Sequence, residues 1–130
     1  HRPMYANDNW DGDDTTSEYL RDSLEGIMEE NTVALGFWGH QHSYGRTCPA
    51  FKGECAKDGD YGAVHLVVGM AGYSLSKSIQ PANYTVFQNN TVYGFVHLTV
   101  HNESVITGKF VDANTTKIVD QFDIINPYKM

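Results

Sequence analysis

Two short, continuous apolar runs constrain the fold of this 130-residue chain more than any other feature. They are TVALGFW at residues 32–38 and AVHLVVGMAG at residues 63–72, and each has the length of one strand. An apolar run of this length without alternation is typical of a strand that is buried on both faces. Because 41% of the chain is apolar, there is enough material to bury such strands in a core.

One helix is predicted before the first apolar run. Residues 15–31 have helical periodicity, with a capping box of Thr15 and Glu18 at the start and Asn31 at the end. Residues 1–14 are polar, rich in Asp and Gly, and have no periodicity, so they are predicted to be loop. The apolar face of the helix is predicted to consist of Leu20, Leu24, Ile27 and Met28.

Alternating strands are predicted in the last third of the chain. The segments 92–100, 104–112 and 117–125 alternate in polarity, and turn-forming residues join them. The order of helix, buried strand, loop, buried strand and antiparallel meander predicts a mixed α/β fold. We expect one packed unit that is the last part of a larger sheet sandwich.

The charge of the chain excludes several classes of partner. Its formal net charge is −7, and it has no run of Lys or Arg, so a nucleic-acid or anionic-membrane surface is not expected. No apolar stretch reaches the roughly 18 residues of a membrane-spanning helix, and no membrane span is predicted. Because the chain starts at HRPMY without Met and without a signal peptide, we expect it to be a processed or partial piece.

The sequence also predicts a compartment. Four Asn-x-Ser/Thr sites occur within residues 83–116, and two cysteines enclose a short loop with Pro and Gly. In an oxidising compartment, Cys48 and Cys55 are expected to form a local disulfide, whereas free thiols or half of a metal knuckle are the alternatives. We favour a secreted, vacuolar or lysosomal glycoprotein. The predicted N-glycosylation sites are Asn83, Asn89, Asn102 and Asn114.

A pair of histidines follows the first apolar run directly. His40 and His42 lie at the carboxyl end of a predicted buried strand, where open α/β sheets place their ligands. A His-x-His pair in turning backbone directs both imidazoles to one side, and two neighbouring divalent ions could take one nitrogen each. Gly39 would let the backbone approach such ions closely. The alternative is that an isolated His-x-His has no function, because it is a common pattern.

The other histidines are weaker candidates. His65 and His97 lie inside strand patterns, where a hydrogen-bonded core or surface histidine is the commoner outcome. His101 is expected in a solvated turn, and Trp38 is expected in the core.

With its flanking residues, the histidine pair resembles a known family. GHQHSYGR at residues 39–46 resembles the Gly-His-x-His motif, with its following Tyr-x-Arg, of the purple acid phosphatases and related metallophosphoesterases. HRPMY, GAVHLVVGMAG, YGFVHLTVHNES and KIVDQFDI resemble further family segments, in the same order and over nearly the whole chain. The resemblance implies the C-terminal half of an αββα sheet sandwich. Residues 1–80 would carry the metal site, and residues 81–130 would be the closing antiparallel strands of the same domain.

The family resemblance also implies a site and a reaction. His1 and His40 would bind a divalent zinc, manganese or iron ion, and His42 would bind ferric iron. The family hydrolyses phosphomonoesters at acidic pH by attack of a metal-bound hydroxide. Two cations would neutralise the phosphate and activate water, so that a chain of charge −7 could still bind an anion. The other metal ligands would come from the missing N-terminal half, and the fragment alone is predicted to be inactive.

This chain departs from the family pattern in two places. The acidic stretch NWDGDD replaces the substrate-binding histidines of plant members, so the proton donor is unassigned. Asp11, Asp13 and Asp14 are weak candidates, against the favoured alternative of a solvated acidic loop or helix start. Gly45 stands where the family usually has Glu. We expect Tyr44 and Arg46 to pack beneath the site and orient the histidines rather than contact phosphate.

Two functions are therefore weighed at this stage. The first is part of a secreted dinuclear acid phosphatase with a phosphate-ester substrate; the state of oligomerisation stays open. The second is a non-catalytic extracellular glycoprotein that keeps the fold for structural or adhesive use. The three retained histidines favour the first.

Overall fold

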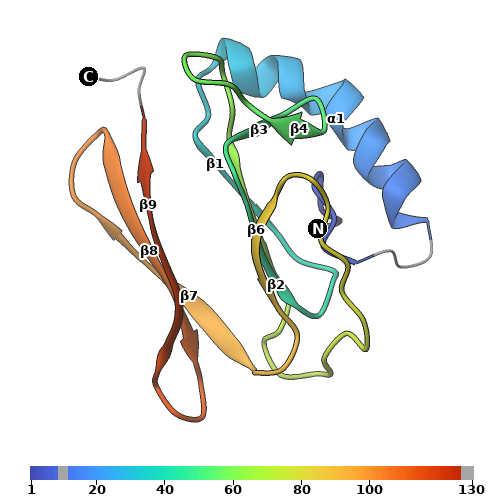
Figure 1. The fold of residues 1–130 in the computed structure, drawn as a ribbon, viewed down its shortest axis with the longest axis vertical. Helices are drawn as coiled ribbons and strands as arrows, with labels where there is room; N and C mark the ends of the chain where they lie inside the picture. Colours follow the sequence, from blue (N-terminus) through green and yellow to red (C-terminus); the bar gives the residue numbers. More distant parts are fainter. Residues whose placement is uncertain (9–11, 127–130) are drawn as a thin grey trace.

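The computed structural model describes residues 1–8 and 12–126, and within them one helix and nine short strands form three layers. The helix α1 lies against one face of a mixed sheet, and a separate three-stranded meander lies on its other side (Figure 1). No helix among the described residues is long and apolar enough to cross a membrane. The elements are α1 (Asp13–Glu30), β1 (Leu35–Trp38), β2 (Tyr44–Thr47), β3 (Ala50–Phe51), β4 (Glu54–Cys55), β5 (Val64–Val68), β6 (Thr85–Asn89), β7 (Gly94–Val100), β8 (Val105–Asp112) and β9 (Ile118–Ile125).

The mixed sheet has the strand order β1-β5-β2-β6. The two predicted apolar runs are its parallel pair, since β1 and β5 align with Leu35 opposite Val64. β5 is buried along most of its length, as predicted, but Phe37 of β1 is 48% exposed. β1 is only half-buried because it forms the edge of the sheet as far as the chain is described.

β2 lies inside the sheet, with antiparallel partners on both sides. These residues belong to the histidine motif, and no strand was predicted for them. β6 also belongs to this mixed sheet, whereas β7, β8 and β9 form the antiparallel meander that the alternation predicted.

The helix differs from its prediction at its start. It begins at Asp13, after Gly12 in the left-handed region at φ 80, and no side chain caps it. The predicted capping box of Thr15 and Glu18 is therefore wrong, because both residues lie inside the helix. Contacts of Asp13 with other segments, described below, fix the earlier start.

The buried side of α1 is more polar than predicted. Leu20 and Met28 pack on a cluster formed by Met4, Tyr5 and Ala50. Leu24 and Ile27, however, are 36% and 57% exposed. Glu25, which is buried, takes a place on the inner side and accepts a very short hydrogen bond from the Tyr5 hydroxyl.

Two further clusters join the mixed sheet to the meander. One contains Leu66 of β5 and Phe122 of β9, and the other stacks Tyr44 on Phe110 with ring centroids 4.2 Å apart. The meander therefore covers the face of the sheet opposite to α1 and completes a layered α/β/β unit.

Candidate functional site

The histidine turn leaves the carboxyl end of β1 and is held by backbone bonds. Gly39 donates to the carbonyl oxygen of His1 at 2.9 Å, which ties the first residue of the chain to the end of the strand. Next, His40 adopts a left-handed backbone with φ 66, a conformation that non-glycine residues rarely take. Ser43 donates to Gln41 at 2.8 Å and turns the chain into β2.

Gln41, between the two histidines, anchors this turn. Its side chain is fully buried, and its Oε1 accepts a 2.7 Å hydrogen bond from the backbone of Asn7. Its Nε2 donates to the Asp8 carbonyl at 2.7 Å and to the Asp13 carboxylate at 2.8 Å. Gln41 had no predicted role, since an amide between two histidines carries no signal in a single sequence.

The structure brings His1 and His40 together. His1 Nε2 and His40 Nδ1 lie 3.3 Å apart, and the two rings meet edge to face. On the other side of the His40 ring, Nε2 lies 3.3 Å from Oδ1 of Asp13. The same oxygen receives a 2.8 Å hydrogen bond from Arg2, the residue after His1.

His42 faces a different loop, the one that follows β5. Its Nδ1 lies 3.0 Å from Oγ of Ser74, and its ring meets the highly exposed Tyr73 ring edge to face. The backbone of Ser76 also donates to the His42 carbonyl at 2.9 Å. A cavity of about 420 Å³ opens here, lined by Asp8, His42, Ser74, Leu75, Ser76, Lys77 and Ser78.

Tyr44 and Arg46 point away from the turn and towards the meander. The Tyr44 hydroxyl donates to Asp120 of β9 at 2.8 Å, and Arg46 binds the same carboxylate through two nitrogens at 2.7 and 3.0 Å. Burial, reinforced by the charge of Asp120, raises the pKa of Tyr44 well above its usual value. These two side chains therefore connect β2, which follows the histidine turn, to the second sheet.

The close approach of Gly45 and Gly69 to their neighbours explains why each has no side chain. The Cβ position of Gly45 is filled by the amide of Asn7 at 2.6 Å, and that amide donates to the Tyr44 carbonyl. A Cβ on Gly69 would lie 1.9 Å from the carbonyl oxygen of Gln41. The histidine turn thus packs directly on the end of β5.

The three acidic candidates for proton transfer are placed differently. Asp11 lies outside the described residues. Asp13 has no exposed surface, and its oxygens face Arg2, His40 and Gln41, so no substrate can reach it. Asp14 is exposed and lines a separate hollow beside Tyr84.

The metal chemistry that the resemblance implies can be tested against this donor set. Two nitrogens bound to a tetrahedral zinc at about 2.0–2.1 Å are separated by about 3.3–3.4 Å. The 3.3 Å between His1 Nε2 and His40 Nδ1 fits two such positions. Within residues 1–8 and 12–126, however, no three His, Cys, Asp or Glu side chains are arranged to hold one ion. The described residues fit part of a metal site and do not complete it.

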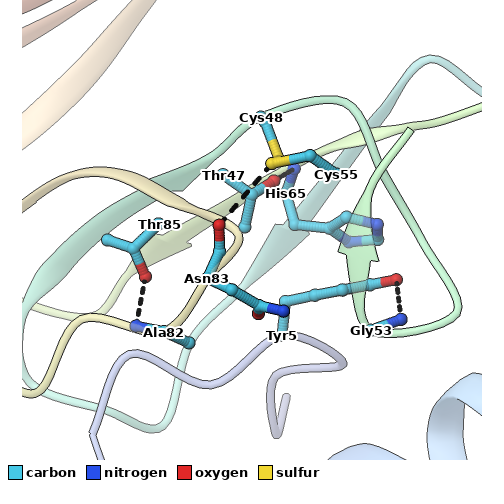
Figure 2. Close-up of a disulfide and its surroundings, with 9 residues drawn as sticks. All are labelled: Tyr5, Thr47, Cys48, Gly53, Cys55, His65, Ala82, Asn83 and Thr85. Carbon is cyan, nitrogen blue, oxygen red and sulfur yellow. Dashed lines mark hydrogen bonds between the residues drawn. A yellow bond between two sulfur atoms is a disulfide. The ribbon is translucent and has the colours of Figure 1, made fainter. Parts of the chain in front are cut away.

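The disulfide joins the residue after β2 to the last residue of β4. Cys48 and Cys55 are bonded, with Cα atoms 5.7 Å apart, as predicted. Figure 2 shows the bond beside the backbone of Asn83, whose carbonyl oxygen lies 3.7 Å from the Cys55 sulfur. In the same region, the Gly53 amide donates a hydrogen bond to the hydroxyl of the buried Tyr5.

The four predicted glycosylation sites lie in loops or at a strand end. Asn83, Asn102 and Asn114 are exposed. The side chain of Asn102 accepts hydrogen bonds from the backbone amides of Ser104 and Val105. Asn89, at the end of β6, is half-buried and accepts a 3.0 Å bond from the Thr91 amide. Their modification stays a prediction.

The remaining histidines lie away from the turn. His65 of β5 is 2% exposed, accepts a 3.0 Å hydrogen bond from the Trp38 indole and packs at a tilt against the Tyr5 ring, with centroids 4.4 Å apart. Burial, together with the nearby charge of Arg21, lowers the pKa of His65 to about 3. His97 and His101 are exposed, and His101 bonds to Thr107.

The chain is similar to several known proteins. Residues 62–121 match a family model described as iron/zinc purple acid phosphatase-like protein C. A protein of Arabidopsis thaliana named "Probable inactive purple acid phosphatase 24" is 32% identical over 99% of this chain and 23% of its own length. The human protein "Acid phosphatase type 7" is 30% identical over 98% of this chain and 33% of its own length. The chain thus spans about a quarter to a third of these relatives.

Two solved structures share the fold. The purple acid phosphatase PPD1 from yellow lupin seeds superposes on 81% of this chain and 20% of its own, with a TM-score of 0.69 and 29% identity. GAP50 of Plasmodium, described as the anchor in the inner membrane complex, covers 96% of this chain and 34% of its own with a TM-score of 0.73. At 20% identity, the second likeness shows the fold alone.

Proposed function

We propose that the chain is the C-terminal part of a metal-dependent acid phosphatase that hydrolyses phosphomonoesters. Residues 62–121 are a purple acid phosphatase-like C-terminal domain, and the relatives of the chain are purple acid phosphatases. The observation that carries the proposal is the His1–His40 pair, with nitrogens 3.3 Å apart. A buried carboxylate behind His40 supports it, since metal-binding histidines usually direct their second nitrogen at such a group.

The residues of this chain would divide the work as follows. His1 and His40 would hold one ion, His42 would hold the other, and a preceding part of the protein would supply the remaining ligands. When bound, the two ions would neutralise phosphate charge and activate water. The expected pair is iron with zinc, manganese or a second iron.

The cavity beside His42 supports binding of an ester at this position. Its lining includes the hydroxyls of Ser74 and Ser78 and the ammonium group of Lys77, together with the carboxylate of Asp8 and the apolar side chain of Leu75. An ester whose phosphate lies at His42 would extend into this space, and Lys77 would contribute a local positive charge in a chain of net charge −7. Asp13 is not proposed as the proton donor, because its carboxylate is fully buried.

An oxidising compartment is part of the same proposal. The Cys48–Cys55 disulfide supports it, because such bonds persist outside the reducing cytosol. The four glycosylation sequences, three of which have an exposed asparagine, add to this support. We therefore propose a secreted, vacuolar or lysosomal setting for the protein.

Substitution of the histidine turn tests the phosphatase proposal. In the longest form of the protein that can be purified, His40→Ala and His42→Ala are each expected to abolish hydrolysis of p-nitrophenyl phosphate. His97→Ala, on the exposed face of β7, is the matched control and should leave turnover unchanged. Wild-type turnover in both turn variants would refute the proposal.

A non-catalytic glycoprotein with the same fold is the second candidate. It is favoured by the Arabidopsis relative named as inactive. The metal content of protein that was never exposed to chelator separates the two candidates. About two transition-metal ions per molecule supports the phosphatase, and one ion or none supports the non-catalytic protein.

A further inference from the structure

Asp13 is the most completely buried charged side chain described in this chain, although it stands in an acidic segment that should face water. Its exposure is 0%, and Asp14, the next residue of α1, is exposed. Carboxylates are almost never fully buried unless they are paired with donors. The contacts of Asp13 therefore need an explanation that helix formation alone does not give.

Each contact of Asp13 leads to a residue of the predicted metal site or to its neighbour. Oδ1 accepts a 2.8 Å hydrogen bond from Arg2, which follows His1. Oδ2 accepts a 2.8 Å bond from Gln41, which lies between His40 and His42. Oδ1 also faces His40 itself at 3.3 Å. One carboxylate thus joins the first residues of the chain to the histidine turn, which lies 39 positions later.

The geometry also selects one form of the His40 ring. A carboxylate beside Nε2 favours the tautomer that carries its proton on Nε2, because the opposite tautomer would set a lone pair against a negative oxygen. In that tautomer Nδ1 is the nitrogen that carries the lone pair, and Nδ1 is the atom that lies 3.3 Å from His1 Nε2. The ring is thereby presented with its unprotonated nitrogen towards the partner histidine.

We propose that Asp13 is a positioning residue, which sets both the separation of His1 and His40 and the tautomer of His40. The inference rests on the proposed function in one respect, namely that the two histidines bind a metal ion. A purely structural role would be favourable interaction of an acidic side chain with the helix N-terminus. Asp14 offers that same interaction from the same turn of α1 without touching the histidine turn, so Asp14→Asn is the matched control.

Asp13→Asn is the sharpest substitution, because it keeps the size and removes the charge. With the amide oxygen towards Arg2 and His40, its NH₂ group would face the NH₂ group of Gln41, donor against donor. Gln41 cannot turn over without losing the bond that its Oε1 accepts from Asn7. The amide therefore cannot restore all three contacts.

Two measurements test the inference. The first is the ring tautomer of His40 in metal-free, ¹⁵N-histidine-labelled protein by NMR, with the signal assigned by its loss in His40→Gln. The second is Zn²⁺ affinity, by competition with a chromogenic chelator, in the longest purifiable form. We expect the Nε2–H tautomer in the wild type, and a loss of Zn²⁺ affinity of about 10- to 100-fold in Asp13→Asn but not in Asp14→Asn.

Several outcomes would overturn the inference. An Nδ1–H tautomer in the wild-type protein does so without any variant, so failure of Asp13→Asn to fold leaves the test intact. Equal Zn²⁺ affinity in the wild type and Asp13→Asn, or an equal loss in Asp14→Asn, also overturns it. A wild type that binds no Zn²⁺ overturns the proposed function together with this inference. Zn²⁺ binding that depends on Asp13 without phosphatase activity leaves the inference standing and refutes only the enzyme.

Discussion

Acidification should destabilise this fold through one buried histidine, His65. Its imidazole is 2% exposed and accepts a hydrogen bond from Trp38 at Nδ1. Burial, aided by the charge of Arg21, lowers its pKa from 6.5 to about 3. Between these two pH values, His65 therefore binds a proton in the unfolded chain but not in the folded protein. His65 contributes stability that is present above pH 6.5 and is lost as the pH falls towards 3.

The magnitude follows from the width of that pH window. Each pH unit below the unfolded pKa lowers the free energy of unfolding by about 1.4 kcal/mol per proton. From pH 7 to pH 5, His65 alone should therefore cost about 2 kcal/mol, a large part of the stability of an ordinary domain. If the protein works at acidic pH, its fold would be less stable there by this amount than at pH 7.

Urea unfolding at pH 7, 6 and 5, followed by circular dichroism, measures the effect. His65→Gln removes the titrating group and keeps a neutral polar side chain of similar size. Its free energy of unfolding should fall about 2 kcal/mol less between pH 7 and pH 5 than that of the wild type. His97→Gln, which removes an exposed histidine, is the control and should keep the wild-type dependence. Equal pH dependence in the wild type and His65→Gln would refute the reasoning.

Two further predictions concern stability. Replacing Cys48 and Cys55 by Ser should lower the free energy of unfolding by about 2.5 kcal/mol, because the closed loop is short, and an unchanged urea midpoint would contradict this. Gly69→Ala should cost about 1–3 kcal/mol, because its Cβ would lie 1.9 Å from the Gln41 carbonyl oxygen. Gly26 lies in α1, and a Cβ there would have nothing within 4 Å, so Gly26→Ala should instead stabilise the fold by about 1 kcal/mol. Thermal unfolding of the two variants measures both effects. If Gly69→Ala and Gly26→Ala changed the melting temperature in the same direction, the result would argue against the close packing of the turn on β5.

The sequence predicted the elements whose signal is local. The continuous apolar residues of β5 and the alternation of β7, β8 and β9 were sufficient to identify those strands. β2 was missed because its four residues, Tyr-Gly-Arg-Thr, have neither a run nor an alternation. It is a strand because β5 and β6 pair with it on both sides and because Asp120 neutralises Arg46.

The candidate site was predictable only in its histidines. Spacing suggested His40 and His42, and the family resemblance added His1. The roles of Gln41 and Asp13 could not be predicted, because the bonds of Gln41 to Asn7, Asp8 and Asp13 span 28 to 34 positions. The predicted start of the helix was wrong for the same reason, namely that distant contacts decide it. Local capping preference indicated Thr15, whereas the tertiary bonds of Asp13 require the helix to begin earlier.

The contrast between the meander and the histidine turn has a consequence for the order of folding. β7, β8 and β9 are joined by short turns, so their pairing closes small loops, and hairpins of this kind form within microseconds. The meeting of His1 and His40 instead closes a loop of 39 positions, and the entropy of that loop is lost before its contacts are gained. We expect the meander to fold early as a template for the mixed sheet. Residues 1–8 should join the mixed sheet after the meander has formed, so the contact of His1 with His40 would form late.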